Sequence, residues 1–205
     1  MSLDLSGRGL TTLYGIYFPD NLNELNVSRN QLTSLEHCPK SLKILFCDDN
    51  QLTSLRYCPD SLIKLHCRGS NITSLQYCPK NLQELQCIGT KITSLQYCPK
   101  SLLFLDCSVN KITSLQYCPK NLLTLYCTHN NLTSLQYCPD SLQKLACYNN
   151  QLTSLRYCPK NLKILYCNSN LLTSLQHCSQ NLEELICSYN QLTSLQYCKE
   201  HILLV

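Results

Sequence analysis

The sequence predicts a solenoid, a stack of nine near-identical units of 20 residues that share one parallel β-sheet. The pattern L-x-x-L-x-C-x-x-N-x-[LI]-T-S-L-x-x-C-P-x-[SN] repeats from Leu22 to His201 without an insertion, and each unit opens with apolar residues that alternate with variable ones. A unit of this length cannot close a core by itself, so the units must stack to bury their apolar side chains. We number the positions of the unit as columns one to twenty, with Leu42 in column one.

The first columns of each unit predict one short strand. Leu fills columns one and four, as in Leu42 and Leu45, and Cys fills column six from Cys47 to Cys187, with Val27 in the first unit. Alternation of apolar and variable residues is typical of a strand with one buried face. Parallel copies about 4.8 Å apart would therefore form a continuous sheet over a long, thin core.

Column nine follows the strand, where the chain must turn inward. An Asn carboxamide there can donate to and accept from buried backbone groups of neighbouring turns. Because leaving such a group unpaired costs about 1–3 kcal/mol, we interpret this column as a structural ladder. The third and fourth units carry Ser70 and Thr90 instead, each after a Gly, so the ladder is altered there. The ladder consists of Asn30, Asn50, Asn110, Asn130, Asn150, Asn170 and Asn190.

The second half of each unit predicts the returning side of the core. Columns eleven, fourteen and seventeen are apolar, with Cys in column seventeen from Cys38 to Cys198. Pro39 through Pro159 occupy column eighteen in seven units, and Pro favours an extended backbone. The sequence therefore predicts extended, non-helical returns with little or no helix.

The pattern L-x-x-L-x-x-x-x-N-x-L-x-x-L resembles that of leucine-rich-repeat proteins over nearly the whole chain. The 20-residue length with a Pro-containing return is similar to the short class in bacterial effector proteins of the YopM and IpaH kind. The Cys after the second Leu and the wording Q-L-T-S-L-Q-Y-C-P are also similar to leucine-rich-repeat proteins of giant amoeba-infecting viruses. The resemblance implies partner binding and no catalytic activity, because the chain shows neither a helical N-terminal cap of the YopM kind nor a ubiquitin-ligase domain of the IpaH kind.

The two ends depart from the repeat within a single array over residues 1–205. Residues 1–21 form a degenerate unit in which Arg8 stands where Asn belongs, residues 22–201 form the nine repeats, and residues 202–205 form a partial strand. The apolar segment with Tyr14, Ile16, Tyr17 and Phe18 is expected to fold over the open N-terminal end of the core as a cap.

Composition and charge favour a folded cytoplasmic protein. The net charge of +4 and the pI near 8.3 fall short of the basic balance of a dedicated nucleic-acid binder. Because no signal peptide precedes the repeats and no apolar run could span a membrane, we expect the cytoplasm, or the host cytoplasm for a viral or effector protein. The 17 cysteines should then be reduced and, at core positions, buried.

The sequence predicts neither an enzyme nor a cofactor or metal site. Cysteine follows histidine at His37, His66 and His177, but these cysteines stand in inward-facing columns, which favours inert buried thiols. The cysteine spacing contains no close pair of the kind that structural zinc sites use. Disulfides between stacked neighbours are disfavoured, since parallel Cβ vectors about 4.8 Å apart miss the usual separation near 3.8 Å. A link between the two Cys columns across the core stays open.

Column sixteen is Tyr in seven units and His in two, and column nineteen is often Lys, as in Lys80, Lys100 and Lys120. Adjacent aromatic and basic ladders could stack bases and hold phosphates, which makes nucleic-acid binding the third function considered. The alternative is that the Tyr rings cover the outside of the core and leave their hydroxyls in water. Asp60 and Asp140 interrupt the Lys ladder and favour this alternative.

The favoured function is protein binding through the strand positions that face away from the core. The invariant columns build the scaffold, so recognition should lie where the units differ, above all in columns three and five on the expected concave face. Aromatic and β-branched residues also simply suit strands, which is the competing explanation. The second function considered is self-association through the C-terminal edge. The candidate partner-binding residues are Ile44, Phe46, His66, Phe104, Asp106, Tyr126, Ile164, Tyr166 and Ile186.

Overall fold

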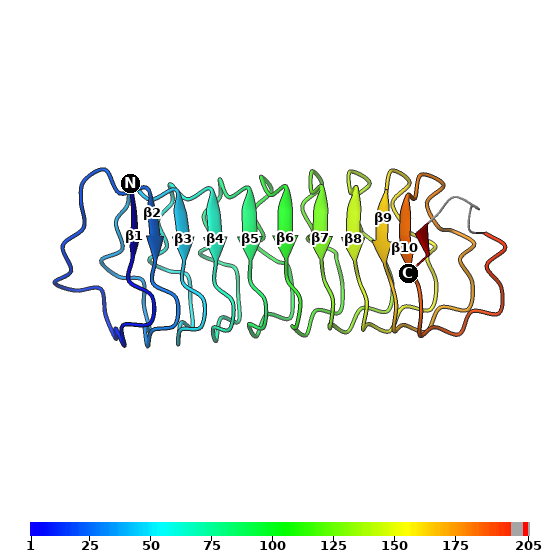
Figure 1. Cartoon of the computed structure of the whole chain (residues 1–205), viewed down its shortest axis with the longest axis horizontal. Coiled ribbons are helices and arrows are strands. Elements are labelled where there is room, and N and C mark those ends of the chain that lie inside the picture. The colour runs from blue at the N-terminus through cyan, green and yellow to red at the C-terminus, as the bar shows by residue number, and fades with distance from the viewer. Residues whose placement is uncertain (198–202, 205) are drawn as a thin grey trace.

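The computed structural model describes residues 1–197 and 203–204, and its sheet contains eleven parallel strands in sequential order, one beside the next along the long axis (Figure 1). Nine of the strands belong to the repeats, one precedes them and one follows. The strands are β1 (Ser2–Asp4), β2 (Glu24–Asn26), β3 (Ile44–Phe46), β4 (Lys64–His66), β5 (Glu84–Gln86), β6 (Phe104–Asp106), β7 (Thr124–Tyr126), β8 (Lys144–Ala146), β9 (Ile164–Tyr166), β10 (Glu184–Ile186) and β11 (Leu203–Leu204).

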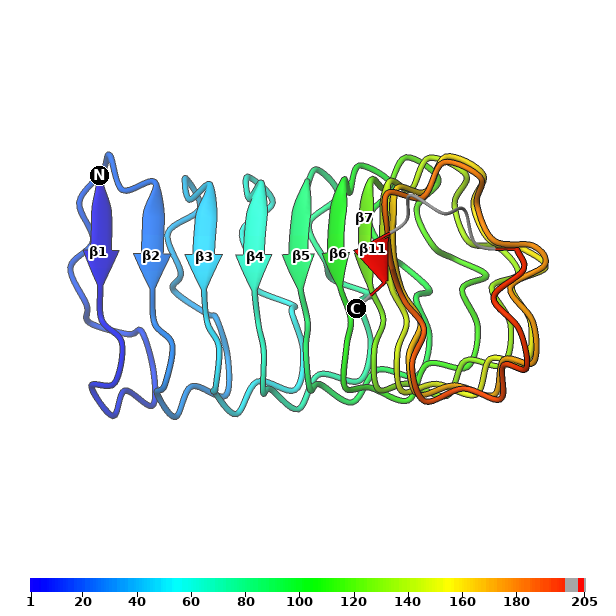
Figure 2. The same cartoon turned by 45° about the vertical axis from the view of Figure 1, so that its right-hand side comes forward.

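The register places identical columns beside one another throughout the repeats. Leu25 of β2 pairs with Leu45 of β3, and Leu45 pairs with Leu65 of β4. In Figure 2 the molecule is turned by 45° from the view of Figure 1. The first strands then face the viewer, whereas the last turns are seen end-on as loops, so the array curves along its length. The returns of the described residues contain no helix. The predicted solenoid with a parallel sheet on one face and non-helical returns on the other is confirmed.

The core is a continuous column of Leu, Ile and Cys side chains. The Leu residues of columns one and four are fully buried through most of the array, as are the Cys residues of column six from Cys47 to Cys167. Several of these thiols, including Cys47, donate to the backbone carbonyl of the next unit, so each joins its neighbour as well as filling space. Every unit thus closes the core of the unit before it.

The Asn ladder has the predicted role, as the sixth unit shows. The Nδ2 of Asn130 donates to the carbonyls of Cys107, Cys127 and Thr128 at 3.1, 3.2 and 3.1 Å. Its Oδ1 accepts the N–H of Ile112 of the preceding unit at 2.9 Å. One side chain therefore satisfies four backbone groups and ties two turns together.

Column eight adopts a left-handed backbone in all nine units. In seven units the residue is not Gly, from Arg29 (φ 56°) to Tyr189 (φ 53°), and even the β-branched Val109 has φ 57°. The two glycines are Gly69 (φ 66°) and Gly89 (φ 60°), and they precede Ser70 and Thr90. Left-handed geometry costs an L-residue about 1–2 kcal/mol. The units that lack the Asn therefore carry the one residue that adopts this turn without strain.

A second polar ladder runs along the opposite edge, where column twenty leads into the strand. The Oγ of Ser101 donates to the carbonyls of Lys80 and Leu82, at 2.7 and 2.6 Å, and Ser61 and Ser141 make the equivalent bonds. Where column twenty holds one of these Ser residues, the turn into the strand is thus anchored to the preceding turn.

The N-terminal unit closes the array only in part. β1 pairs with β2 in the same register, and the side chains of Ile16 and Phe18 pack against the core. Tyr14 and Tyr17 are 74% and 86% exposed, so the expectation that they cover the core is wrong. At the other end Leu203 and Leu204 pair with β10, whereas Ile202 and Val205 of the predicted edge lie outside the described residues.

Candidate binding face

The outward side chains of columns three and five on β2 to β10 form one surface, which we call the strand face. Each strand directs its middle Leu into the core and the residues on either side of it outward, which gives the alternation of buried and half-buried positions. All nine candidate binding residues lie on this surface. Each is half-buried, because parallel neighbours at strand spacing cover one another's flanks.

Between β3 and β5 the strand face is a closed polar network around Glu84. Its Oε1 lies 3.0 Å from Lys64 Nζ and 3.0 Å from His66 Nε2, and it accepts a hydrogen bond from Gln86 Nε2 at 3.1 Å. Burial raises the pKa of Glu84, but the hydrogen bonds from His66 and Lys64 outweigh it, so the net shift is downward. The Phe46 ring meets the His66 ring edge-on at 4.8 Å. The charges of this part neutralise one another within the chain.

Between β6 and β10 the strand face is aromatic. The rings of Phe104 and Tyr126 meet edge-on at 5.5 Å. The ammonium of Lys144 lies over the rings of Tyr126 and Tyr166, 5.4 and 5.2 Å from their centroids. The Tyr166 hydroxyl donates to Glu184 Oε1 at 2.8 Å. These contacts hold the Phe104, Tyr126 and Tyr166 side chains in defined positions within the chain itself.

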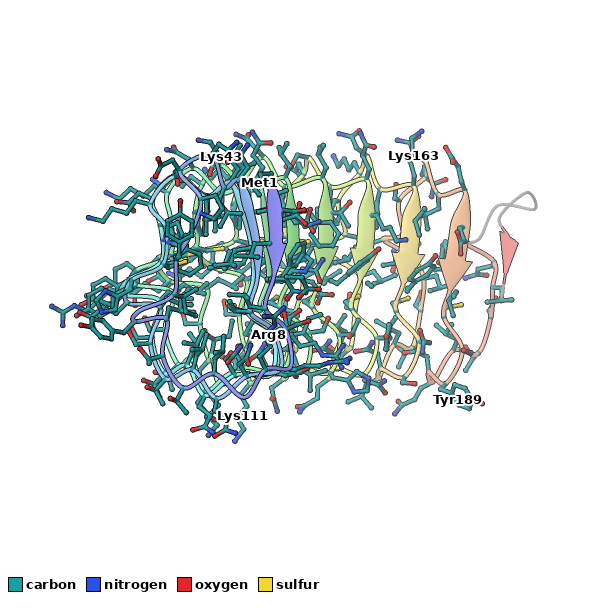
Figure 3. The ribbon with its side chains drawn as sticks, turned by 60° about the vertical axis from the view of Figure 1, so that its left-hand side comes forward. Met1, Arg8, Lys43, Lys111, Lys163 and Tyr189 are labelled. Carbon is teal, nitrogen blue, oxygen red and sulfur yellow. The ribbon has the colours of Figure 1, made fainter. Side chains whose placement is uncertain are left out.

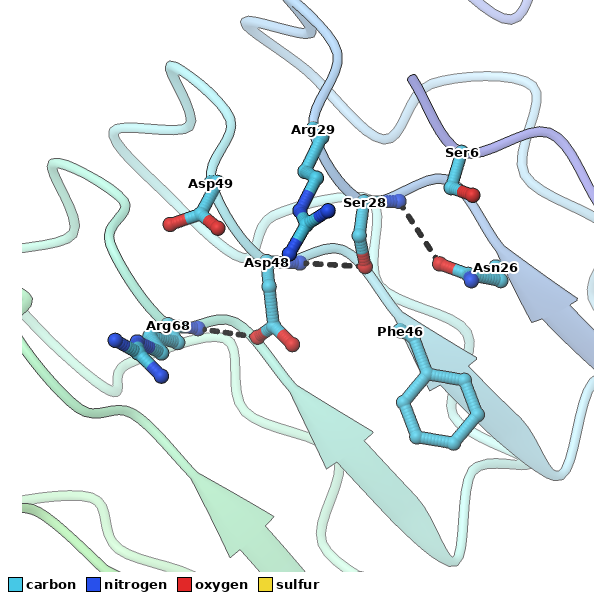
Figure 4. Close-up of a pocket in the computed structure, with 8 residues that line it drawn as sticks. All are labelled: Ser6, Asn26, Ser28, Arg29, Phe46, Asp48, Asp49 and Arg68. Atoms are coloured by element: carbon cyan, nitrogen blue, oxygen red, sulfur yellow. Dashed lines mark hydrogen bonds between the residues drawn. The ribbon is translucent and has the colours of Figure 1, made fainter. Parts of the chain in front are cut away.

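A polar hollow of about 340 Å³ lies where β2 to β4 end (Figure 4). Phe46 forms one wall, and Arg29, Asp49 and Arg68 surround the opening. The backbone N–H of Arg68 donates to Asp48 Oδ1 at 2.7 Å, which holds this carboxylate against the loop. Burial raises the pKa of Asp48. The hollow combines charges of both signs with an aromatic wall, which suits a polypeptide segment.

Charged side chains flank the strand face on both sides. Lys43 and Lys163 project from the edge where the strands begin, and Lys111 projects from the opposite edge (Figure 3). The beginning edge also holds three exposed apolar side chains of column two, Ile63, Leu103 and Leu123. An apolar centre with a charged rim is the usual anatomy of a protein interface.

The cysteines are buried as predicted. Of the sixteen that the structure describes, fourteen are buried and Cys138 and Cys187 are partly buried, and the structure links no two of these sixteen in a disulfide. Burial raises the pKa of Cys38 to about 12 and that of Cys158 to about 11, and it raises the pKa of Cys47 well above its ordinary range. Thiolates are therefore scarce at neutral pH. Within residues 1–197 and 203–204, no three His, Cys, Asp or Glu side chains gather in a way that could hold a metal ion.

The Tyr column lies on the far side of the solenoid from the strand face, and its rings are about half exposed, from 42% at Tyr197 to 55% at Tyr97 and Tyr137. Shallow hollows separate successive rings. The one between Tyr97 and Tyr117 has a volume of about 600 Å³ and is also lined by Lys100 and Lys120. The predicted aromatic and basic ladders therefore do lie side by side.

Several residues of the strand face and of the column beside it were not among the candidates. Lys64, Glu84 and Lys144 stand in column three, and Asp48 and Arg68 stand in the neighbouring column seven, both of which vary from unit to unit. Most candidates other than His66 and Asp106 were selected for apolar size, a criterion that passes over charged residues. Column variability alone would have included them.

The structure resembles leucine-rich-repeat proteins of known structure. YopM from Yersinia enterocolitica WA-314 is 29% identical with a TM-score of 0.69 over 86% of this chain and 44% of its own. YopM from Yersinia pestis, described as a leucine-rich effector protein, is 26% identical with a TM-score of 0.69 over 92% of this chain and 60% of its own. The APL1 leucine-rich-repeat domain is 23% identical with a TM-score of 0.70 over 83% of this chain and 50% of its own, which shows the fold alone.

These likenesses establish the fold as that of a leucine-rich-repeat solenoid. The chain spans between 44% and 60% of the length of these three proteins. No family model and no curated protein matches the sequence. The described part of the chain contains no helix that is long and apolar enough to cross a membrane.

Proposed function

We propose that the chain is a non-enzymatic interaction module that binds a protein partner through the strand face. The observation that carries this proposal is the aromatic part of the face, where Phe104, Tyr126 and Tyr166 are held by neighbours in columns that the core does not need. Rigid aromatic side chains with a polar rim are the usual hot spots of protein interfaces. The resemblance to YopM, a leucine-rich effector protein, supports the same general role.

The chemistry of the thiols argues against catalysis and for a reducing compartment. Nucleophilic cysteines need a lowered pKa and access to solvent, whereas burial raises the pKa of Cys38, Cys67 and Cys118 to about 12. Buried cysteines at this density without disulfides among the described residues are typical of a cytoplasmic protein. We therefore place the module in the cytoplasm, which is the host cytoplasm for a viral or effector protein.

The test is an affinity pull-down with a quadruple variant, Phe46→Ala, Phe104→Ala, Tyr126→Ala and Tyr166→Ala. Because hot-spot truncations cost about 2 kcal/mol each, the variant should lose its specific partner. Its circular dichroism and unfolding midpoint must stay close to those of the native chain. The control is the double variant Tyr117→Ala and Tyr137→Ala in the far Tyr column, which should keep the partner. Retention of every partner by the quadruple variant would contradict the proposal.

A second candidate is single-stranded nucleic-acid binding by the Tyr and Lys columns. It is favoured by the hollow that Tyr97, Lys100, Tyr117 and Lys120 line together, because aromatic stacking with nearby cations holds single strands. A labelled oligonucleotide should then bind in a salt-dependent way and be released by Tyr117→Ala. Binding that survives this substitution would remove the candidate.

Self-association through the C-terminal edge stays a prediction. β11 is the last strand of the described sheet, and an apolar edge strand can template pairing with another chain. Sedimentation velocity over a range of concentrations tests it, and a strict monomer would argue against an assembly role.

A further inference from the structure

Lys64 and Lys144 occupy the same place in units three and seven, yet they differ in their counter-ions. Both stand in column three, and the ammonium of each lies over the aromatic ring of the preceding unit, 5.8 Å from the Phe46 centroid and 5.4 Å from the Tyr126 centroid. In register with Lys64 stands Glu84, whose carboxylate lies 3.0 Å away. In register with Lys144 stands Ile164. The same cation is neutralised in one unit and faces an apolar neighbour in the other.

Lys144 therefore presents a charge for which the described chain offers no ion-pair partner. Among the described residues, the three ion pairs are Lys64–Glu84, His66–Glu84 and Lys163–Glu183. The carboxylate that contributes to the field at Lys144 is that of Glu184, two strands away, and this carboxylate accepts the Tyr166 hydroxyl. The cation is thus held by the two ring faces and the Tyr126 hydroxyl, which attract it less strongly than a paired carboxylate does.

The surroundings of Lys144 form a seat for an incoming side chain. In β8 the next outward residue is Ala146, which is 3% exposed and lies in register between Tyr126 and Tyr166. The two rings flank this small, buried side chain, and the Lys144 ammonium lies over both of them as the charged end of the seat. The interaction with the Tyr126 hydroxyl raises the pKa of Lys144, so this end stays protonated.

We propose that the Lys144 ammonium in this seat binds the carboxylate of an Asp or Glu side chain in a protein partner, with apolar neighbours of that acid packed on Phe104 and Tyr126. The assignment rests on the proposed function and names the chemistry of its central contact. It follows from charge complementarity, because this cation lies over two aromatic rings and has no ion pair among the described residues. The equivalent seat at Lys64 is already filled by Glu84 and is closed to a partner.

The test uses a displayed library of random peptides selected on the native protein. Peptides whose binding is lost in the quadruple strand-face variant are kept, sequenced and synthesised. We expect them to share an acidic residue flanked by apolar ones. Lys144→Gln should weaken their binding by about tenfold or more, as expected for a desolvated charge pair. Changing the shared acid of the peptide to its amide should cause the same loss, and the two changes together should cost little more than either alone.

Two lysines provide matched controls. Lys163→Gln removes the same charge from an exposed ion pair outside the strand face, and it should leave peptide affinity within about twofold of native. Lys64→Gln removes a cation that is already neutralised, so its effect should be far smaller than that of Lys144→Gln. Circular dichroism and the unfolding midpoint of each variant check that the array stays folded.

The outcomes separate this inference from the function on which it rests. Selected peptides that need Phe104, Tyr126 and Tyr166 but carry no shared acid and tolerate Lys144→Gln would overturn the carboxylate seat and leave the binding face intact. If Lys163→Gln and Lys144→Gln weaken the binding of acidic peptides equally, the effect comes from the net charge of the protein. That outcome would also overturn the carboxylate seat. Selection of no peptide that depends on the strand face would count against both proposals.

Discussion

The sixth and third units share the same strand, the same Leu and Cys core and the same turn, but they stabilise that turn by different means. In the sixth unit Asn130 satisfies four backbone groups, and the residue before it, His129, is held in the left-handed region (φ 52°). In the third unit Ser70 replaces Asn, its Oγ lacks a hydrogen-bond partner in the described structure, and Gly69 precedes it.

The difference shows that one turn can be specified in two ways. Hydrogen bonds from the Asn offset the strain of a left-handed residue, so column eight can then vary freely. Without them, Gly removes the strain, but fewer hydrogen bonds hold the turn: the Ser70 hydroxyl makes none, and Thr90 Oγ1 donates to the Cys87 carbonyl and to Asn110 Oδ1. The third and fourth units should therefore be the least stable part of the array.

The largest effect is expected for Asn130→Ala. The substitution leaves the N–H of Ile112 without its partner and removes three bonds to carbonyls that each keep one other donor, so the free energy of unfolding should fall by about 1–3 kcal/mol. The measurement is urea unfolding followed by circular dichroism. Gln136→Ala, on the exposed side of the same unit, should change stability by less than about 0.5 kcal/mol. Equal midpoints for the two variants would mean that the ladder has no such role.

Exchanging Val and Gly in column eight should have the next largest effects on stability. The two substitutions should act with opposite signs. Val109 is β-branched, adopts φ 57° and is 52% exposed, so Val109→Gly relieves strain at little loss of burial. We expect a gain of about 1 kcal/mol, and a loss of similar size for Gly89→Val. Thermal unfolding of the two variants side by side measures both. A loss of stability in Val109→Gly would show that the left-handed backbone of Val109 costs no free energy in the folded array.

Ser70→Asn should restore the ladder in the third unit. By analogy with Asn130, the new amide would donate to the carbonyls of Cys47 and Cys67 and accept the N–H of Leu52. A net gain of about 1 kcal/mol is expected, since a typical hydrogen bond contributes about this much. Hydrogen exchange at units three and four should slow in parallel. Unchanged exchange there would place the weak point of the array elsewhere.

The smallest effect concerns a charge on the strand face. Burial raises the pKa of Asp106 in the folded chain, while Oδ1 accepts the N–H of Ser108. The ionised carboxylate therefore destabilises the fold at neutral pH, and the penalty disappears as the pH falls through the folded pKa. Asp106→Asn keeps the acceptor and removes the charge, so it should add less than about 1 kcal/mol at pH 7 and nothing below about pH 4. A gain that is independent of pH would exclude this cause.

The sequence was sufficient to predict the fold, because a strict period fixes both the strand and its register. The ladder residues were predictable for the same reason, since each column repeats one local environment. The left-handed turn was not predicted, because Arg29, Val109 and Tyr189 give no sign of it, although Gly69 and Gly89 mark it.

The strand face was predictable in position but not in character. The candidate residues were located by their columns, yet their half-burial depends on the side chain of the next unit. The network of Lys64, His66 and Glu84 likewise depends on which residue stands 20 positions onward. Tyr14 and Tyr17 were placed wrongly because the degenerate unit carries two extra residues, which obscure its alignment with the columns.

Each strand touches only the strand before it and the strand after it, and this has an evolutionary consequence. Duplication or deletion of one whole 20-residue unit would preserve every hydrogen bond except those at a single junction, and that junction would be rebuilt from identical columns. The distance between the neutralised Lys64 and the unpaired Lys144 could therefore change in steps of one strand spacing without a new fold. A lineage of such chains could fit partners of different length by gene duplication alone, with point mutations needed only to choose which unit carries the charge.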